Sequence, residues 1–167
     1  MRSNTRARAV SAPVCLLHDV SVSKKEAAVT IEQQTPRITL VVDGGSRGNP
    51  GFGYGSFHLS DSFGHDEIMR LEFGDGVTNN QAEYRTLLAA LERAQEHARQ
   101  HDWPVSQVAL HIITDSQLMA EQLRGRWQVR DLQLRMLYDR ARKALRAFGH
   151  VTISHRPRRE IVAVLGH

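Results

Sequence analysis

The sequence has few of the features that define several large protein classes. Its 167 residues include one cysteine, Cys15, so neither an intrachain disulfide nor a cysteine zinc cluster can form. A lone cysteine is compatible with a reducing compartment, and we expect a cytoplasmic protein. No apolar run approaches the roughly 18 residues that span a membrane, so no membrane association is expected.

Acidic residues are outnumbered, with 18 Asp and Glu against 22 Lys and Arg and a formal net charge of +4. This excess permits a polyanionic partner, although a modest positive charge also serves solubility alone. A hydrophobic content of 41% and a charged content of 24% are typical of a globular protein. The length suits one domain, and nothing in the sequence indicates an oligomer, so a monomer is expected.

Residues 1–36 show no sustained hydrophobic period, and we predict a disordered N-terminal extension that ends at Pro36. A short helix or strand around residues 27–31 is an alternative. The first eight residues carry three arginines and no acid, which would also suit an organelle transit peptide. The folded domain is expected at residues 37–167.

Beyond Pro36 the hydrophobic pattern predicts strands and helices in the order β-β-β-α-β-α-α-β-α. Strands are expected at 37–43, 54–59, 67–73, 108–114 and 151–154, with the glycine-rich segment 44–55 as a turn. Helices are expected at 80–100, 116–123, 131–148 and 160–165, the first of them capped by Thr78 or Asn79. The order predicts an α/β fold with a five-stranded mixed sheet flanked by helices.

Three acids occupy informative places in this pattern. Asp43 ends the first strand, Asp115 ends the fourth, and Glu83 lies in the first turn of the long helix. If the two strands are neighbours, all three carboxylates meet at one edge of the sheet, where they suit Mg²⁺ or Mn²⁺. Each also has a simpler explanation: Asp43 can cap a glycine turn, Glu83 can complement the helix dipole, and Asp115 can cap the next helix. Their combination favours the metal site.

Three sequence blocks surround these acids: VVDGGSRGNPG at 41–51, TNNQAEY at 78–84 and TDSQL at 114–118. In this order they resemble the type 1 ribonuclease H family, over roughly residues 38–167. The resemblance implies a ribonuclease H-like fold and metal-dependent cleavage of the RNA strand of an RNA–DNA hybrid. It assigns Asp43, Glu83 and Asp115 as catalytic metal ligands, with Mg²⁺ or Mn²⁺ acting as a two-metal pair that leaves a 5′-phosphate and a 3′-hydroxyl.

The resemblance also implies contacts with the hybrid. Amides in the second and third blocks match positions that contact its minor groove, where the 2′-hydroxyl distinguishes RNA from DNA. The glycines of the first block would let the backbone approach the RNA, while Asn49 also shapes the turn. Arg126 and Trp127 suit the DNA strand, although a solvated loop with a core tryptophan is an alternative. The substrate-binding residues expected are Gly44, Gly45, Ser46, Asn49, Thr78, Asn79, Asn80, Gln117, Arg126 and Trp127.

The C-terminal segment departs from the family pattern. Many relatives carry a fourth acid near the start of the final helix and a histidine upstream of it. Here His155 matches that histidine, and Leu165 stands ten residues later, where the acid would be. The remaining polar candidates are Glu160 and His167, and His167 is predicted as a catalytic group, with a frayed end as the alternative.

A missing carboxylate would weaken the second metal site. It keeps a second hypothesis open, a hybrid-binding module of the same fold that cuts poorly or not at all. A structure-specific DNA nuclease of this fold is a third hypothesis, which the amides of the TNNQAEY block disfavour, because they suit a hybrid's minor groove.

Overall fold

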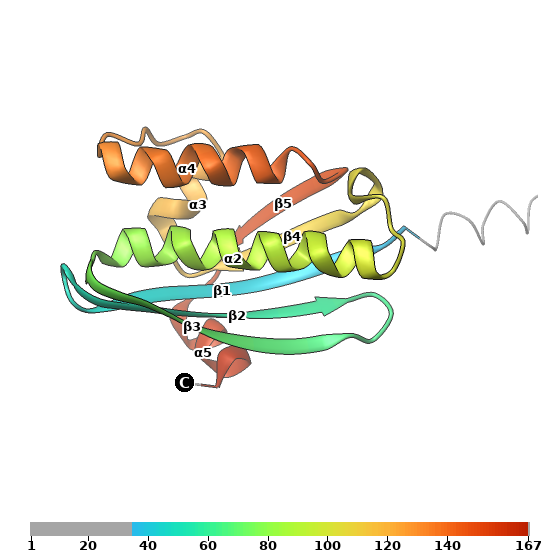
Figure 1. Ribbon diagram of the computed structural model, residues 1–167, viewed down its shortest axis with the longest axis horizontal. Helices are drawn as coiled ribbons and strands as arrows, with labels where there is room; N and C mark the ends of the chain where they lie inside the picture. The colour runs from blue at the N-terminus through green and yellow to red at the C-terminus, as the bar shows by residue number, and fades with distance from the viewer. Residues whose placement is uncertain (1–34, 167) are drawn as a thin grey trace, which may run out of the picture. The chain divides into compact units, whose positions relative to one another are not determined.

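Five strands form one mixed sheet in the order β3-β2-β1-β4-β5 (Figure 1). The computed structural model describes residues 35–166, and these belong to one unit. β1 pairs antiparallel with β2 and parallel with β4, β2 pairs antiparallel with β3, and β4 pairs parallel with β5. The predicted five-stranded mixed sheet is therefore confirmed. The strands are β1 (Arg37–Gly48), β2 (Gly51–Asp61), β3 (Asp66–Val77), β4 (Ala109–Thr114) and β5 (His150–His155).

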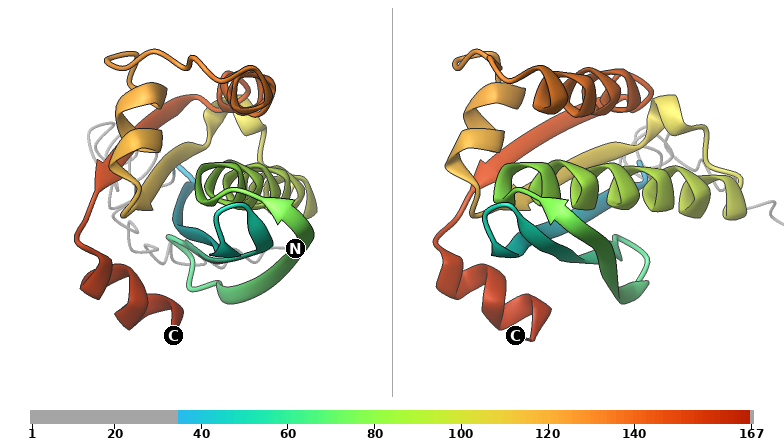
Figure 2. Two further views of the ribbon diagram at one scale, coloured as in Figure 1. Left: turned by 90° about the vertical axis from the view of Figure 1, so that its left-hand side faces the viewer. Right: turned by 60° about the vertical axis from the view of Figure 1, so that its left-hand side comes forward.

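Helices lie on both faces of the sheet (Figure 2). They are α2 (Asn79–Gln100), the short η1 (Val105–Gln107), α3 (Gln117–Leu123), α4 (Leu132–Leu145) and α5 (Arg158–Leu165). The main core lies between the sheet and the pair α2 and α4, and a smaller core joins α5 to Val41 on the opposite face. None of the described helices is long and apolar enough to cross a membrane.

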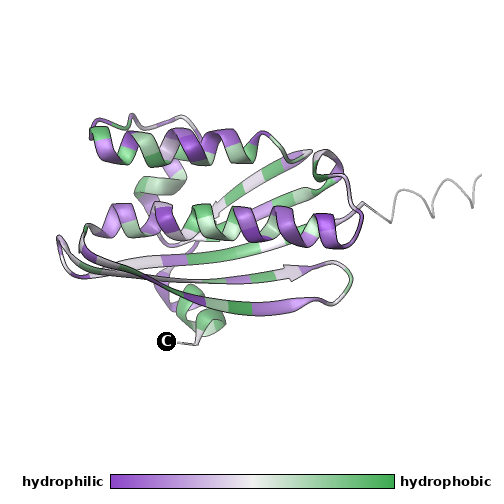
Figure 3. Ribbon diagram, viewed as in Figure 1, coloured by the Kyte–Doolittle hydropathy of each residue, from purple (hydrophilic) through white to green (hydrophobic). Residues whose placement is uncertain are grey.

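Local sequence explains why α2 begins where it does. The Thr78 side chain accepts a hydrogen bond from the Gln81 backbone N–H, and the Gln81 side chain accepts one from the Thr78 backbone N–H. This capping box satisfies two backbone donors that a helix start leaves without partners. Of the two caps predicted, Thr78 is the one observed. Apolar residues then recur at helical spacing, visible as alternating bands in Figure 3. Among them, Leu87 and Leu91 are buried against the sheet.

The prediction of a turn over residues 44–55 is wrong. β1 continues to Gly48 and β2 begins at Gly51, so the turn is confined to Asn49 and Pro50. Glycine is a poor strand former on average, but here it is required by a close approach. A Cβ on Gly44 would lie 2.5 Å from the carbonyl carbon of Ala82 in α2.

The other element boundaries shift by a few residues. β3 extends to Val77, α4 ends at Leu145, and α5 begins at Arg158, two residues earlier than predicted. The short helix η1 was not predicted. The expectations for residues 1–34, including the element around 27–31, lie outside the described residues.

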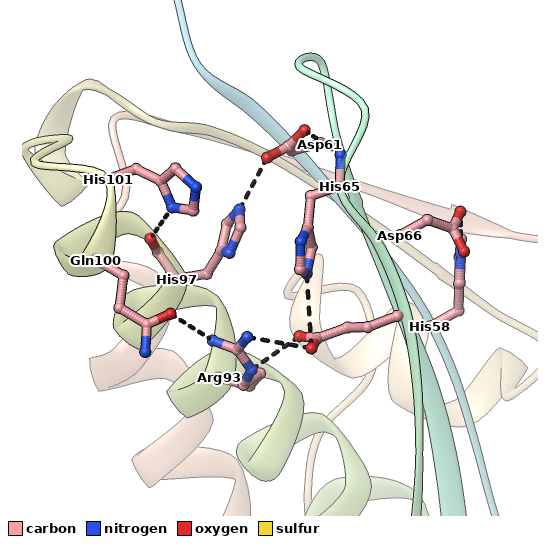
Figure 4. A network of polar contacts seen from close by, with 9 residues as sticks. His58, Asp61, His65, Asp66, Arg93, His97, Gln100 and His101 are labelled. Atoms are coloured by element: carbon pink, nitrogen blue, oxygen red, sulfur yellow. Dashed lines mark hydrogen bonds and ion pairs between the residues drawn. The ribbon is translucent and has the colours of Figure 1, made fainter.

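A histidine-rich network ties the β2–β3 turn to the C-terminal end of α2 (Figure 4). His97 is fully buried, its Nε2 lies 2.8 Å from Asp61 Oδ2, and its ring centroid lies 4.3 Å from those of His65 and His101. Asp61 Oδ1 also accepts hydrogen bonds from the backbone N–H groups of Phe63 and His65. This contact fixes the end of α2 that is remote from Glu83.

Candidate active site

Strand pairing places two of the three acids side by side. The parallel register joins Val42 of β1 to Thr114 of β4, so Asp43 and Asp115 follow at the same edge of the sheet. The N-terminal part of α2 reaches that edge because Gly44 lets the helix approach, and it brings Glu83, just past the first turn, to the pair. Ligand oxygens of the three residues all lie within 4.8 Å of one another. The structure therefore brings together the three acids that the sequence singled out.

The cluster is electrostatically unfavourable without a cation. Asp43 and Glu83 are buried, with 2% and 9% of their surface exposed. Burial, followed by the charges of Asp43 and Asp115, raises the pKa of Glu83 well above its ordinary value, against a hydrogen bond from the Gly44 backbone. Burial and the charge of Asp43 also raise the pKa of Asp115. A cation among these groups would relieve both effects.

Arg158, in the first turn of α5, already contributes one positive charge. Its Nη1 lies 3.3 Å from Asp43 Oδ1 and 3.2 Å from Asp115 Oδ2. Sequence reasoning missed this residue. The available signal was the basic run that follows β5, because β5 is parallel to β4 and delivers the next residues to the edge that carries Asp115.

The donor set fits a hard divalent cation. It consists of carboxylate oxygens, which Mg²⁺ and Mn²⁺ prefer. Glu83 Oε2 is buried and has no hydrogen-bond partner, so a ligand atom is held in place without a protein donor to satisfy it. Asp115 does not cap α3, since Ser116 accepts the capping hydrogen bond from the Met119 N–H.

The structure explains why no fourth carboxylate completes the group. Leu165 is fully buried and packs with Val41 and Ile161 in the smaller core. Glu160 is exposed on α5 and does not belong to the cluster of Asp43, Glu83 and Asp115. His167 lies outside the described residues.

Several predicted substrate residues hold the β1–β2 hairpin against the start of α2. The backbone N–H of Ser46 donates to Asn79 Oδ1 at 2.8 Å, and Ser46 Oγ donates to the Val77 carbonyl at 2.7 Å. The Asn79 backbone N–H in turn donates to Asn49 Oδ1 at 3.2 Å. These contacts give Ser46, Asn49 and Asn79 a structural role whatever they bind.

Other predicted substrate residues are exposed. Asn80, Gln117 and Arg126 all lie at the surface, and Trp127 is 47% exposed, so it is not a core residue. Gly44 is buried beneath α2, and Gly45 lies against the Tyr54 ring. The hairpin, the start of α2, α3 and the loop before α4 share one end of the unit, which faces the viewer in the left panel of Figure 2.

The chain is similar to known proteins over most of the described region. A family model described as reverse transcriptase-like matches residues 63–164. Ribonuclease HI of Halobacterium salinarum is 38% identical over 134 residues, which are 78% of this chain and 62% of that protein. A bifunctional protein of Mycobacterium tuberculosis is 32% identical over 123 residues, which are 73% of this chain and 32% of that protein. The chain thus spans less than two thirds of the length of these relatives.

Solved structures show the same fold. RNase H1 from Halobacterium salinarum superposes with a TM-score of 0.63 at 36% identity, over 75% of this chain and 89% of that one. LC11-RNase H1, isolated from compost and solved in complex with an RNA/DNA hybrid, gives a TM-score of 0.67 at 25% identity, over 76% and 90% of the two chains. The ribonuclease H-like fold predicted from the sequence is confirmed.

Proposed function

Because this chain belongs to the ribonuclease H family, we propose that it is an endonuclease that hydrolyses the RNA strand of RNA–DNA hybrids and leaves a 5′-phosphate and a 3′-hydroxyl. The observation that carries the proposal is the gathering of Asp43, Glu83 and Asp115 within 4.8 Å at one sheet edge. A fold of this kind can host many activities, so the site, more than the fold, supports this one.

Asp43, Glu83 and Asp115 would hold the divalent ions, Mg²⁺ or Mn²⁺. When bound, such ions supply an activated water and stabilise the leaving 3′ oxygen of a phosphodiester. The protein provides a rigid, largely buried set of ligands whose repulsion is relieved by the ions. Arg158 lies at the rim of the same cluster with 61% of its side chain exposed, so its guanidinium can also approach a phosphate.

The surrounding surface suits a hybrid duplex. The starts of α2 and α3 lie next to the acids in sequence and carry Thr78, Asn79, Asn80 and Gln117. The amide side chains among these residues can pair with base edges and 2′-hydroxyls. Arg126 and Trp127 would contact the DNA strand through phosphate and sugar. Support comes from the hybrid bound to a relative of the same fold.

A weak or inactive hybrid-binding module is the second candidate. Two observations favour it: a buried Leu165 stands where a fourth acid was expected, and Arg158 bridges two of the three acids that are present. The three clustered carboxylates favour the enzyme, because a module that only binds a polyanion gains nothing from buried negative charge.

Residues 37–167 would form the ribonuclease H domain, and the protein would be a cytoplasmic monomer. Catalytic participation of His167 is part of the proposal as well.

A substrate panel tests the function. A labelled RNA strand is presented in an RNA–DNA hybrid, in duplex RNA and alone, each with Mg²⁺, Mn²⁺ or chelator. We expect cutting of the hybrid only, dependent on the metal, with 5′-phosphorylated products. Hybrid binding without cutting would instead establish the binding module, and cutting of duplex DNA in a parallel lane would establish a different nuclease.

A further inference from the structure

Two hydrogen bonds through one buried glutamine connect the helix that carries Glu83 to the loop that carries Arg126 and Trp127. Tyr84, the neighbour of Glu83, is fully buried, and its hydroxyl donates to Gln122 Oε1 at 2.9 Å. Gln122, near the end of α3, is 4% exposed, and its Nε2 donates to the backbone carbonyl of Gln128 at 3.4 Å. One glutamine thus joins α2 to the 124–131 loop.

The loop is held on both sides of its exposed residues. Before them, the Glu121 carbonyl accepts hydrogen bonds from the backbone N–H groups of Arg126, at 2.9 Å, and Trp127, at 3.2 Å. After them, Gln122 binds the Gln128 carbonyl, and Val129 enters the core. The side chains of Arg126 and Trp127 are 68% and 47% exposed, and Arg126 also pairs with Glu121 Oε2 at 3.4 Å.

The buried Gln122 amide needs both of its hydrogen-bond partners. If it loses one, the cost of removing the amide from water is no longer offset, so the observed side-chain conformation is the favourable one. Without the Gln122 contact only the hydrogen bonds to the Glu121 carbonyl would hold this part of the loop, so Arg126 and Trp127 would adopt more orientations, and ordering them on binding would weaken affinity.

We infer that Gln122 is a positioning residue, which fixes the 124–131 loop relative to the acid cluster so that Arg126 and Trp127 meet the DNA strand of the hybrid. The inference rests on the proposed function. Gln122 would thus contribute to the affinity for hybrid, and to the salt dependence of that affinity, without touching metal or substrate.

The test compares hybrid binding by the intact chain and by Gln122→Met, which keeps the length of the side chain and removes both hydrogen bonds. Binding is measured in chelator, by fluorescence anisotropy of a labelled hybrid across a salt series. We expect about threefold to tenfold weaker binding and a salt slope reduced by about 1, the signature of one lost phosphate contact. The maximal cleavage rate should change little while KM rises.

Gln95→Met is the matched control. Gln95 also donates from α2 to a backbone carbonyl, that of Ala144 at 3.4 Å, but on the far part of the α2–α4 contact. The same chemical change there should leave hybrid binding and its salt slope unaltered. Tyr84→Phe serves as a second variant, since it removes only the hydroxyl that joins α2 to Gln122, and it should shift binding in the same direction.

Coupling separates positioning from general destabilisation. Residues that act through one another are not additive. Arg126→Ala combined with Trp127→Ala should weaken binding, and adding Gln122→Met to that pair should then have little further effect. Fully additive losses, or unchanged binding in both Gln122→Met and Tyr84→Phe, would overturn the inference. If the unmodified chain fails to bind hybrid, the proposed function falls first and this inference with it.

Discussion

Gly44→Ala tests how closely the acid cluster depends on the packing of α2 against β1. The added Cβ would lie 2.5 Å from both the Ala82 carbonyl carbon and the Glu83 amide nitrogen, whereas ordinary contacts begin at 3.4 Å. Both neighbours are backbone atoms, so no rotamer change relieves the clash, and the helix must move away by about 1 Å. Overpacking of this kind costs about 1–3 kcal/mol of stability.

The displacement acts directly on catalysis, because it carries Glu83 away from Asp43. A misplacement of about 1 Å reduces a rate that depends on positioning by about 100-fold. Single-turnover cleavage of a labelled hybrid at saturating Mg²⁺ measures this loss, and thermal unfolding measures the change in stability.

Gly149→Ala supplies the control for Gly44→Ala. A Cβ at Gly149 would also clash with backbone atoms, those of Ser106. This contact lies where β4 and β5 begin, whereas Asp115 follows the other end of β4. This variant should unfold at a lower temperature and still cleave at the unmodified rate. An unchanged cleavage rate in Gly44→Ala, with the protein folded, would refute the idea that this close approach positions Glu83.

Three further variants probe charges in the fold. Although burial opposes it, hydrogen bonds from His97 and the backbone hold the pKa of Asp61 below 3.8. Asp61 therefore stabilises the fold above that pH, and its contribution is lost as pH falls through the folded pKa. In urea unfolding, Asp61→Asn should be less stable than the unmodified protein at neutral pH, and the two stabilities should converge in acid. The raised pKa of Glu83 has the opposite sign: in chelator, stability should fall as pH rises above 4.5, and melting curves of Glu83→Gln should show a smaller fall, because the raised pKa of Asp115 also contributes to it. Arg158→Met removes a cation that competes for Asp43 and Asp115, and because the Arg158 side chain is 61% exposed, Mn²⁺ affinity in calorimetry should rise by no more than about fivefold; weaker Mn²⁺ binding would show that Arg158 supports the ions.

The parts of the fold that follow from local pattern were predictable. The apolar run of β1 and the 3.6-residue period of α2 identify these elements, and the Thr78 cap sets the start of the helix. The sequence placed Asp43 and Asp115 at strand ends, which predicts their meeting once β1 and β4 are assumed to be adjacent. Asp115 does follow the end of β4, but Asp43 lies inside β1, which continues to Gly48. The acid cluster was therefore accessible from sequence.

Features that depend on tertiary contact were not predictable in the same way. The glycines of β1 suggest a turn when read locally, and only the approach of α2 to Gly44 shows why they stand in a strand. Arg158 reaches the acids through the placement of α5, which periodicity does not reveal. Leu165 could be recognised as a residue that binds no metal, but not as part of a core with Val41 and Ile161.

Removal of each acid in turn tests the central claim most directly. Single-turnover hybrid cleavage at saturating Mg²⁺ is compared for Asp43→Asn, Glu83→Gln and Asp115→Asn, with Asp139→Asn as the control, since Asp139 lies exposed on α4 and pairs only with Arg135 among the described residues. We predict a loss of at least about 100-fold for each of the three and no loss for the control, because each carboxylate fixes charge at the reacting phosphate. Cleavage at the unmodified rate by any one of the three would contradict the shared metal site.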